Sequence, residues 1–326
     1  MATGTAAAPA HTSENLSARN NAAAKSRAIT LASFFSIYFI WGSTYLGIRY
    51  AVETIPPLYT AGFRHLVAGS LLLIWALAKG LRPTARQIRA SIVIGFFFFL
   101  IGHGTLHWAE TRVPSGLASL FIATEPIWVF LVAAIAERKW RMNAPLLGGV
   151  VLGLGGVALL LGRDGTATGP GMFVGAVACL VGAISWSVGI IYSRRSHLSG
   201  SPLLLSALSL VSGSVLLLTT GTLVGEAHAF SFSQVALRSW LALGYLIVFG
   251  SVIAFTAYNW LMEHYPPTFV ATHTYINPVV AVFLGWWLAG EKVTINVAIA
   301  AALVIAAVFL VDRGMAKLQI DSSTAA

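Results

Sequence analysis

Polar side chains inside otherwise apolar stretches are the residues of this sequence whose types and spacing could do chemistry. Glu125 stands in the segment Thr124-Glu125-Pro126, and Asn277 stands in the similar segment Ile276-Asn277-Pro278. Because proline cannot donate to the carbonyl four residues before it, Pro126 and Pro278 are each expected to kink a helix at mid-depth. A polar side chain beside a freed carbonyl is typical of a substrate site at the bilayer midplane. The alternative is a structural role, with a protonated Glu125 hydrogen-bonded to a neighbouring helix.

Three further residues, His103, His107 and Glu110, fall within an arc of about 60° on one helix, at roughly 100° per residue. Histidines four residues apart can ligate a metal ion, and with Glu110 they could serve an intramembrane enzyme acting on a lipid or isoprenoid substrate. No third strong ligand follows at a tight spacing. We therefore predict no metal, no cofactor and no catalytic residue, and interpret the three side chains as lining a wet cavity. Asn259, next to Tyr258, matches His107 in the second half of the chain.

Arg64 and His65 lie about a turn inside their apolar stretch. Arg64 either extends to the membrane surface or faces the interior, where its guanidinium could bind a substrate carboxylate through two hydrogen bonds. His273 shares a helix face with Asn277, because residues four apart lie one above the other. Trp41 is deeper than an interfacial tryptophan, which favours an aromatic lining for the same cavity.

The composition limits the elements that can position these residues. Of the 326 residues 57% are hydrophobic and only 10% are charged, and the mean hydropathy is +0.80. Soluble proteins contain about 25% charged residues, so this chain cannot cover a water-facing surface. A soluble enzyme, a nucleic-acid-binding module and a disordered scaffold are excluded, and the lipid bilayer is the expected partner.

Ten stretches are long and apolar enough to cross a bilayer, which takes about 20 residues per helix. They are continuous and lack the strict alternation of barrel strands, so an all-α integral membrane fold is predicted. Their expected ranges are 30–51, 59–79, 90–110, 113–136, 144–162, 170–193, 203–225, 239–262, 265–289 and 294–312.

Lysine and arginine near the ends of these spans indicate the orientation. With the N-terminus in the cytoplasm, 14 of the 20 basic residues lie on the cytoplasmic side. These are Arg19, Lys25, Arg27, Lys79, Arg82, Arg86, Arg89, Arg138, Lys139, Arg141, Arg194, Arg195, Arg313 and Lys317. The positive-inside rule thus predicts that both termini are cytoplasmic, on tails of residues 1–29 and 313–326, the first of them disordered.

The two halves of the chain resemble each other. Trp108, Pro114 and Pro126 recur as Trp260, Pro266 and Pro278, each 152 residues later. Five spans per half force the second copy to enter the membrane upside down. We therefore predict two inverted repeats, residues 30–162 and 170–312, which is a transporter architecture because rocking of one bundle against the other exposes a central site to each side in turn.

Several motifs together resemble the EamA family of the drug/metabolite transporter superfamily, near its YedA-like members. They are Ile40-Trp41-Gly42-Ser43-Thr44-Tyr45, Gly62-Phe63-Arg64, Trp108-Ala109-Glu110, Val113-Pro114-Ser115-Gly116-Leu117-Ala118, Ile184-Ser185-Trp186, Phe249-Gly250-Ser251, Tyr275-Ile276-Asn277-Pro278-Val279-Val280-Ala281 and Gly290-Glu291. The resemblance implies ten helices in two inverted five-helix repeats around a central cavity, and efflux of amino acids or related metabolites across the bacterial inner membrane. His103 and His107 depart from the family pattern, which makes them candidates for selectivity in this chain.

The sequence thus predicts a secondary transporter that exports small metabolites or drugs by alternating access, with the intramembrane enzyme as the alternative. The expected site consists of the midplane pair and the side chains around it: Glu125, Asn277, His103, His107, Asn259, Tyr258, Trp41, Arg64, His65 and His273. Whether Glu125 carries a coupling proton or binds an amine of the substrate stays open.

Overall fold

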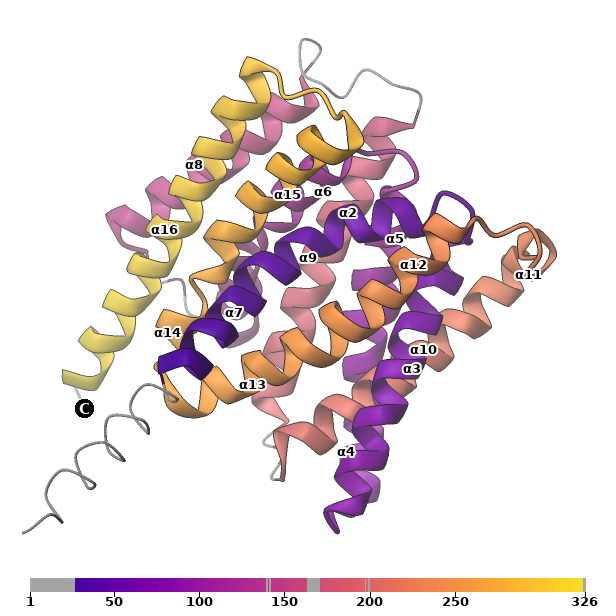
Figure 1. Cartoon of the computed structure of the whole chain (residues 1–326). Helices are drawn as coiled ribbons and strands as arrows, with labels where there is room; N and C mark the ends of the chain where they lie inside the picture. The colour runs from indigo at the N-terminus through magenta and orange to yellow at the C-terminus, as the bar shows by residue number, and fades with distance from the viewer. Residues whose placement is uncertain are drawn as a thin grey trace, which may run out of the picture.

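The structure, a computed structural model, describes residues 27–138, 140, 142–162, 171–196, 198 and 200–324. The expected N-terminal tail up to residue 26 lies outside the described residues, as do Lys139 and Arg141, which entered the orientation count. The described part of the chain is helical, without strands (Figure 1).

The helices follow the predicted spans within a few residues. The first span, Arg27–Ala51, contains the π-helix η1 (Ser36–Ile40) and α2 (Trp41–Ala51). The others are α3 (Pro57–Ala78), α4 (Ala85–Gly95), η2 (Phe96–His103), α5 (Gly104–Ala109), α6 (Ser115–Ile122), α7 (Glu125–Glu137), α8 (Ala144–Leu161), α9 (Met172–Arg195), α10 (Pro202–Leu223), α11 (Glu226–Ala229), α12 (Leu237–Tyr245), η3 (Leu246–Ile253), α13 (Ala254–His264), α14 (Pro267–Val270), α15 (His273–Ala289) and α16 (Ile295–Thr324).

Among the described residues, nine helices are long and apolar enough to cross a membrane. The expected ninth span, 265–289, is divided into α14 and the 17-residue α15. The expected tail from residue 313 is helical as far as Thr324, because α16 continues. Met315 and Leu318 pack in the cluster of Leu146 and Val311, so apolar contacts with α8 extend α16 beyond the predicted span.

Helix starts follow local capping chemistry. Thr84 and Gln87 form a reciprocal capping box before α4, with N···O distances of 2.8 and 3.2 Å. Asn143 Oδ1 accepts from the Leu146 amide at 3.0 Å before α8. By contrast, α3 and α6 begin after Pro56 and Pro114, whose side chains cannot cap a helix.

Small residues let the outer helices pack in pairs. α8 lies along α16 at one edge of the molecule, and α3 lies along α10 at the other (Figure 1). A Cβ on Gly149 would lie 2.7 Å from the Ala307 carbonyl oxygen, and one on Gly69 would lie 2.7 Å from Leu210 Cβ. Glycine at these positions therefore permits the close approach of the helix axes.

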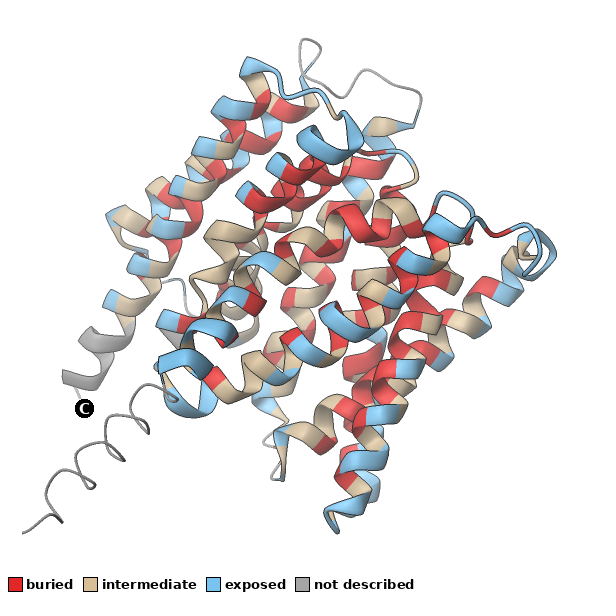
Figure 2. Ribbon diagram, in the orientation of Figure 1, coloured by how far each residue is buried: buried red, intermediate tan, exposed pale blue. Residues whose placement is uncertain are grey.

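Burial differs between the two ends of the bundle. At one end α6 packs against α15 and α2, and every residue from Ser115 to Phe121 is buried. Towards the other end α7 packs against α9 and α16, and residues 271–277 are all half-buried. Figure 2 shows this contrast as red helices around α2, α6 and the upper part of α15, and mixed tan and pale blue helices around α7 and α13.

Candidate functional site

The first group of polar side chains, the arginine–histidine cluster, consists of Arg64, His65, His103, His107 and Glu110. Arg64 and His65 belong to α3, His103 to η2 and His107 to α5, and Glu110 directly follows α5. Arg64 is only 5% exposed, and its Nε donates to Ser251 Oγ of η3 at 2.9 Å. Of the two interpretations of Arg64, the structure thus supports the inward-facing one, because the guanidinium does not extend to the surface.

The histidines of this cluster are linked in part. His65 Nε2 and His103 Nδ1 are 2.7 Å apart, and the His103 ring stacks on Trp186 with centroids 5.2 Å apart. His107 Nδ1 lies 2.7 Å from the His103 carbonyl oxygen, so its other nitrogen is available for another group. Within the described chain, no three His, Cys, Asp or Glu side chains lie close enough together to hold a metal ion.

Several buried atoms of the cluster have no hydrogen-bond partner among the described residues: His65 Nδ1, His107 Nε2 and both carboxyl oxygens of Glu110. Glu110 directly follows α5 and is fully buried, and Arg49 donates to its backbone carbonyl. An unpaired buried polar group costs about 1–3 kcal/mol. Several unpaired buried polar atoms close together are therefore typical of a functional site.

The second group, the aromatic cluster, consists of Trp41, Tyr258 and His273. The Trp41 ring lies 5.2 Å from the Tyr258 ring and 5.1 Å from the His273 ring, measured between centroids. Trp41 Nε1 donates to the Gly250 carbonyl of η3 at 3.0 Å, which fixes the indole. All three residues are half-buried, as is Asn259 beside them in sequence. The structure thus brings together predicted site residues from three separate spans.

Asn277 is used within the protein. With its amide in the orientation that satisfies its surroundings, Nδ2 donates to the carbonyl oxygens of Ile37 at 3.0 Å, Tyr38 at 2.9 Å and His273 at 3.2 Å. Ile37 and Tyr38 belong to η1, where the π-helical turn pairs backbone groups five residues apart in place of the four of an α-helix. Asn277 therefore joins the ninth predicted span to the first, and among the described residues no hydrogen bond links it to Glu125.

Glu125 begins α7 just after a break in the fourth span. α6 ends at Ile122, and Pro126 occupies the first turn of α7, so the fourth span is interrupted just before the proline at which a kink was predicted. The side chain is half-buried, and no described residue donates a hydrogen bond to its carboxyl group. Ser187 Oγ of α9 donates to its backbone carbonyl at 3.4 Å.

The kink predicted at Pro278 falls inside a continuous helix. α15 runs through Pro278, and the ninth predicted span is interrupted earlier, at Ala271 and Thr272, before α15 begins. Membrane helices tolerate an internal proline where side chains satisfy nearby backbone groups. Here the Asn277 amide donates to the His273 carbonyl in the preceding turn, which stabilises the helix around the proline.

Two carboxylates that sequence reasoning did not place cap the helices that start after proline. Glu291 accepts from the Ser115 amide at 2.7 Å, from Ser115 Oγ at 2.8 Å and from the Gly116 amide at 3.0 Å, all at the start of α6. Glu226 accepts from the amides of Leu58 at 3.1 Å and Tyr59 at 2.9 Å, at the start of α3. Each carboxylate comes from the second half of the chain and caps a helix of the first.

The two caps share one end of the bundle, which we call the capped face. Burial raises the pKa of Glu226, and the two amide donors offset part of this effect. The only sequence signal for the caps is a pair of helices that start after proline without a capping side chain, together with acidic residues in distant loops.

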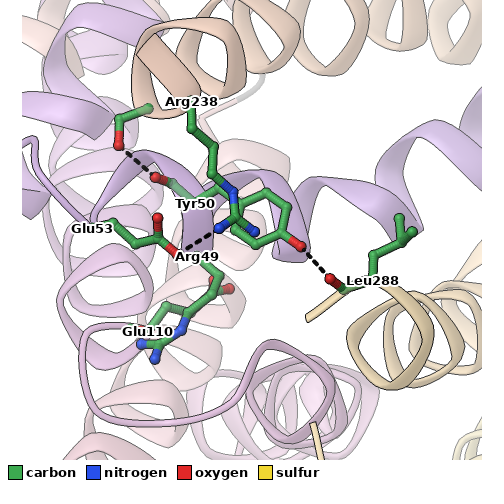
Figure 3. A network of polar contacts seen from close by, with 7 residues as sticks. Arg49, Tyr50, Glu53, Glu110, Arg238 and Leu288 are labelled. Atoms are coloured by element: carbon green, nitrogen blue, oxygen red, sulfur yellow. Dashed lines mark hydrogen bonds and ion pairs between the residues drawn. The ribbon is translucent and has the colours of Figure 1, made fainter. Parts of the chain in front are cut away.

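A further polar network joins the halves at the capped face (Figure 3). Tyr50 Oη donates to the Leu288 carbonyl at 3.0 Å, and Ser239 Oγ donates to the Tyr50 carbonyl at 2.7 Å. The Arg238 guanidinium lies 3.5 Å above the Tyr50 ring and 3.7 Å from the Glu53 carboxylate. The end of α2 is thus bonded to α12 and α15.

The chain is similar to known membrane transporters. The EamA-like transporter family matches the chain twice, over residues 28–162 and 173–312. An uncharacterized inner membrane transporter of Escherichia coli K12, YedA, is 35% identical over 284 residues, which cover 86% of this chain and 90% of YedA. An uncharacterized transporter of Bacillus subtilis, YoaV, is 24% identical over 86% of this chain and 95% of its own length.

A chain in a crystal structure shares the fold, with a TM-score of 0.60 at 21% identity, covering 87% of this chain and 97% of that one. Both named relatives are described as transporters, and neither as an enzyme. The alternative of an intramembrane enzyme acting through His103, His107 and Glu110 therefore receives no support. The protein is an integral membrane transporter, and the chain belongs to the EamA-like transporter family.

Proposed function

We propose that the protein is a secondary carrier that exports amino acids or related small metabolites across the bacterial inner membrane by alternating access. Its ten spans, with α14 and α15 together as the ninth, form two inverted repeats, and both termini face the cytoplasm. The double match of one family to the two halves supports the duplication. The excess of basic residues in alternate loops supports the orientation.

The observation that carries this proposal is the difference between the two ends of the bundle. At the capped face, Glu226 and Glu291 of the second half cap helices of the first half, and α6 is buried from Ser115 to Phe121. Glu125 and the aromatic cluster lie outside this packed region and are half-buried. A bundle closed at one face and looser towards the other is expected of a carrier in one of its two states.

The half-buried side chains suggest how the substrate is held. The faces of Trp41 and Tyr258 attract an ammonium group, and Glu125 would bind the same amine or carry a coupling proton. Arg64 uses its Nε to donate to Ser251, so its two Nη groups are available to bind a carboxylate of the substrate. A small zwitterion, with apolar surface for the aromatic rings, satisfies these groups together.

The role of Glu125 can be tested in proteoliposomes or in cells that overproduce the protein. We expect Glu125→Gln to lose most efflux of the transported amino acid, or to lose its dependence on an imposed pH gradient. Glu137→Gln is the matched control, because Glu137 is an exposed acid at the other end of α7. Equal efflux by wild type and Glu125→Gln, with and without the gradient, would remove Glu125 from both roles.

A further inference from the structure

A pocket that none of the predicted site residues lines lies between the start of α4 and the end of α9. Its volume is about 450 Å³, and its lining includes Arg86 and Arg89 of α4 with Tyr192, Arg195 and Ser196 at the end of α9. α4 belongs to the first half of the chain and α9 to the second. The pocket is therefore another place at which the halves meet.

The charges of this pocket are uncompensated. Among the described residues no acidic side chain lines it, and its three arginines are exposed and form no ion pair. Arg86 Nη2 donates to the Ser196 carbonyl at 3.0 Å, so one guanidinium is fixed by the backbone at the end of α9. Arginine binds phosphate through two parallel hydrogen bonds, and three guanidinium groups around one cavity repel each other unless an anion lies between them.

The surface beside the pocket indicates what carries the anion. Ile88 and Ile92 lie one turn beyond Ala85 and Arg89 on α4, and they are 42% and 45% exposed. In a spanning helix these exposed side chains contact lipid tails, so an acyl chain can lie along them while its headgroup reaches the arginines. The positive-inside rule also predicts that this end of α4 and α9 lies at the cytoplasmic leaflet, where anionic lipids concentrate.

We propose that the pocket between α4 and α9 binds the phosphate of an anionic phospholipid, whose acyl chains lie along Ile88 and Ile92. The lipid bridges the two halves of the transporter at the membrane surface. Loop arginines that only satisfy the positive-inside rule would show no preference for a particular lipid and no dependence on this pair of helices.

The test uses the purified full chain in a neutral detergent, titrated with phosphatidylglycerol, phosphatidylcholine or inorganic phosphate while lipid binding is followed by native mass spectrometry. We expect phosphatidylglycerol to bind at least about tenfold more tightly than phosphatidylcholine, and inorganic phosphate not to compete at millimolar concentration. Arg89→Gln combined with Arg195→Gln should weaken the binding of phosphatidylglycerol at least about tenfold, while leaving the Arg86–Ser196 hydrogen bond in place.

The matched control is Arg313→Gln combined with Lys317→Gln, which removes the same charge from the end of α16 outside the pocket. An equal loss of affinity in the control would show that net charge alone attracts the lipid, and would overturn the proposal. So would equal binding of the two phospholipids. Effective competition by inorganic phosphate would assign the site to a free anion instead. Gel filtration of both double variants checks that a loss of affinity does not reflect unfolding.

Discussion

Replacing Glu291 by alanine should loosen the capped face by an amount that can be estimated from its contacts. The carboxylate accepts three hydrogen bonds at 2.7–3.0 Å from Ser115 and Gly116, two of them from orphan amides at the start of α6. Hydrogen bonds to charged groups contribute about 1.5–3 kcal/mol each, and loss of a helix cap costs about 0.5–2 kcal/mol. Because Glu291 is half-buried and water can replace part of the loss, we expect about 2 kcal/mol in total.

Two measurements test this estimate. Thermal unfolding in detergent should show a midpoint lowered by about 4–8 °C, since 1 kcal/mol shifts the midpoint of domains of roughly 150–250 residues by about 2–4 °C. A cysteine placed at Ser119, which is buried in α6, should react with a membrane-impermeant maleimide much faster in the Glu291→Ala background. If all of the 2 kcal/mol stabilises the closed capped face, its opening equilibrium shifts by roughly 30-fold.

Glu263→Ala is the control, because Glu263 is an exposed acid on α13. Native Cys179 is fully buried and should contribute little labelling. If Glu291→Ala matched Glu263→Ala in both unfolding midpoint and labelling rate, the cap would have no part in closing the face.

Two other substitutions test the packing around the site. Asn277→Asp replaces an amide that donates to two η1 carbonyls by a carboxylate that can only accept. We expect it to lower the unfolding free energy by about 2 kcal/mol or more, and by more than Asn277→Ala does. Equal effects of the two substitutions would argue against the donated hydrogen bonds. Gly149→Val should destabilise by at least about 2 kcal/mol, because its Cβ would lie 2.7 Å from the Ala307 carbonyl oxygen, whereas Gly155→Ala meets nothing within 4 Å and should be neutral in the same thermal assay.

The parts of the fold that depend on local sequence could be predicted. Continuous apolar runs indicated the spans, because a helix that crosses lipid must satisfy its own backbone over about 20 residues. α16 exceeded its predicted range because its extension depends on contacts with α8, which hydropathy does not contain. Pro278 did not break α15 because Asn277 donates to the preceding turn, and this orientation depends on η1 lying beside it.

The candidate site was predictable where residues share a helix. His103 and His107 were found from their spacing, and His65 joins them because α3 packs against α5 and the His65 ring reaches His103 at the end of η2. The inward direction of Arg64 could not be decided from sequence, because it depends on Ser251 nearly 190 residues later. The caps formed by Glu226 and Glu291 were missed for the same reason, since a loop carboxylate gives no local sign of the distant helix that it meets.

The π-helical turn at η1 gives the first span a hinge that needs no loop. The Trp41 amide donates to the Ser36 carbonyl, five residues back, so one residue more than an α-helix requires is stored in this turn. If that residue were drawn out and the turn became α-helical, Trp41 would rotate by roughly 100° relative to the residues before η1. Its indole would leave the Gly250 carbonyl and both aromatic neighbours. A change of one hydrogen-bond register would thus dismantle the aromatic cluster while every span stayed in the bilayer.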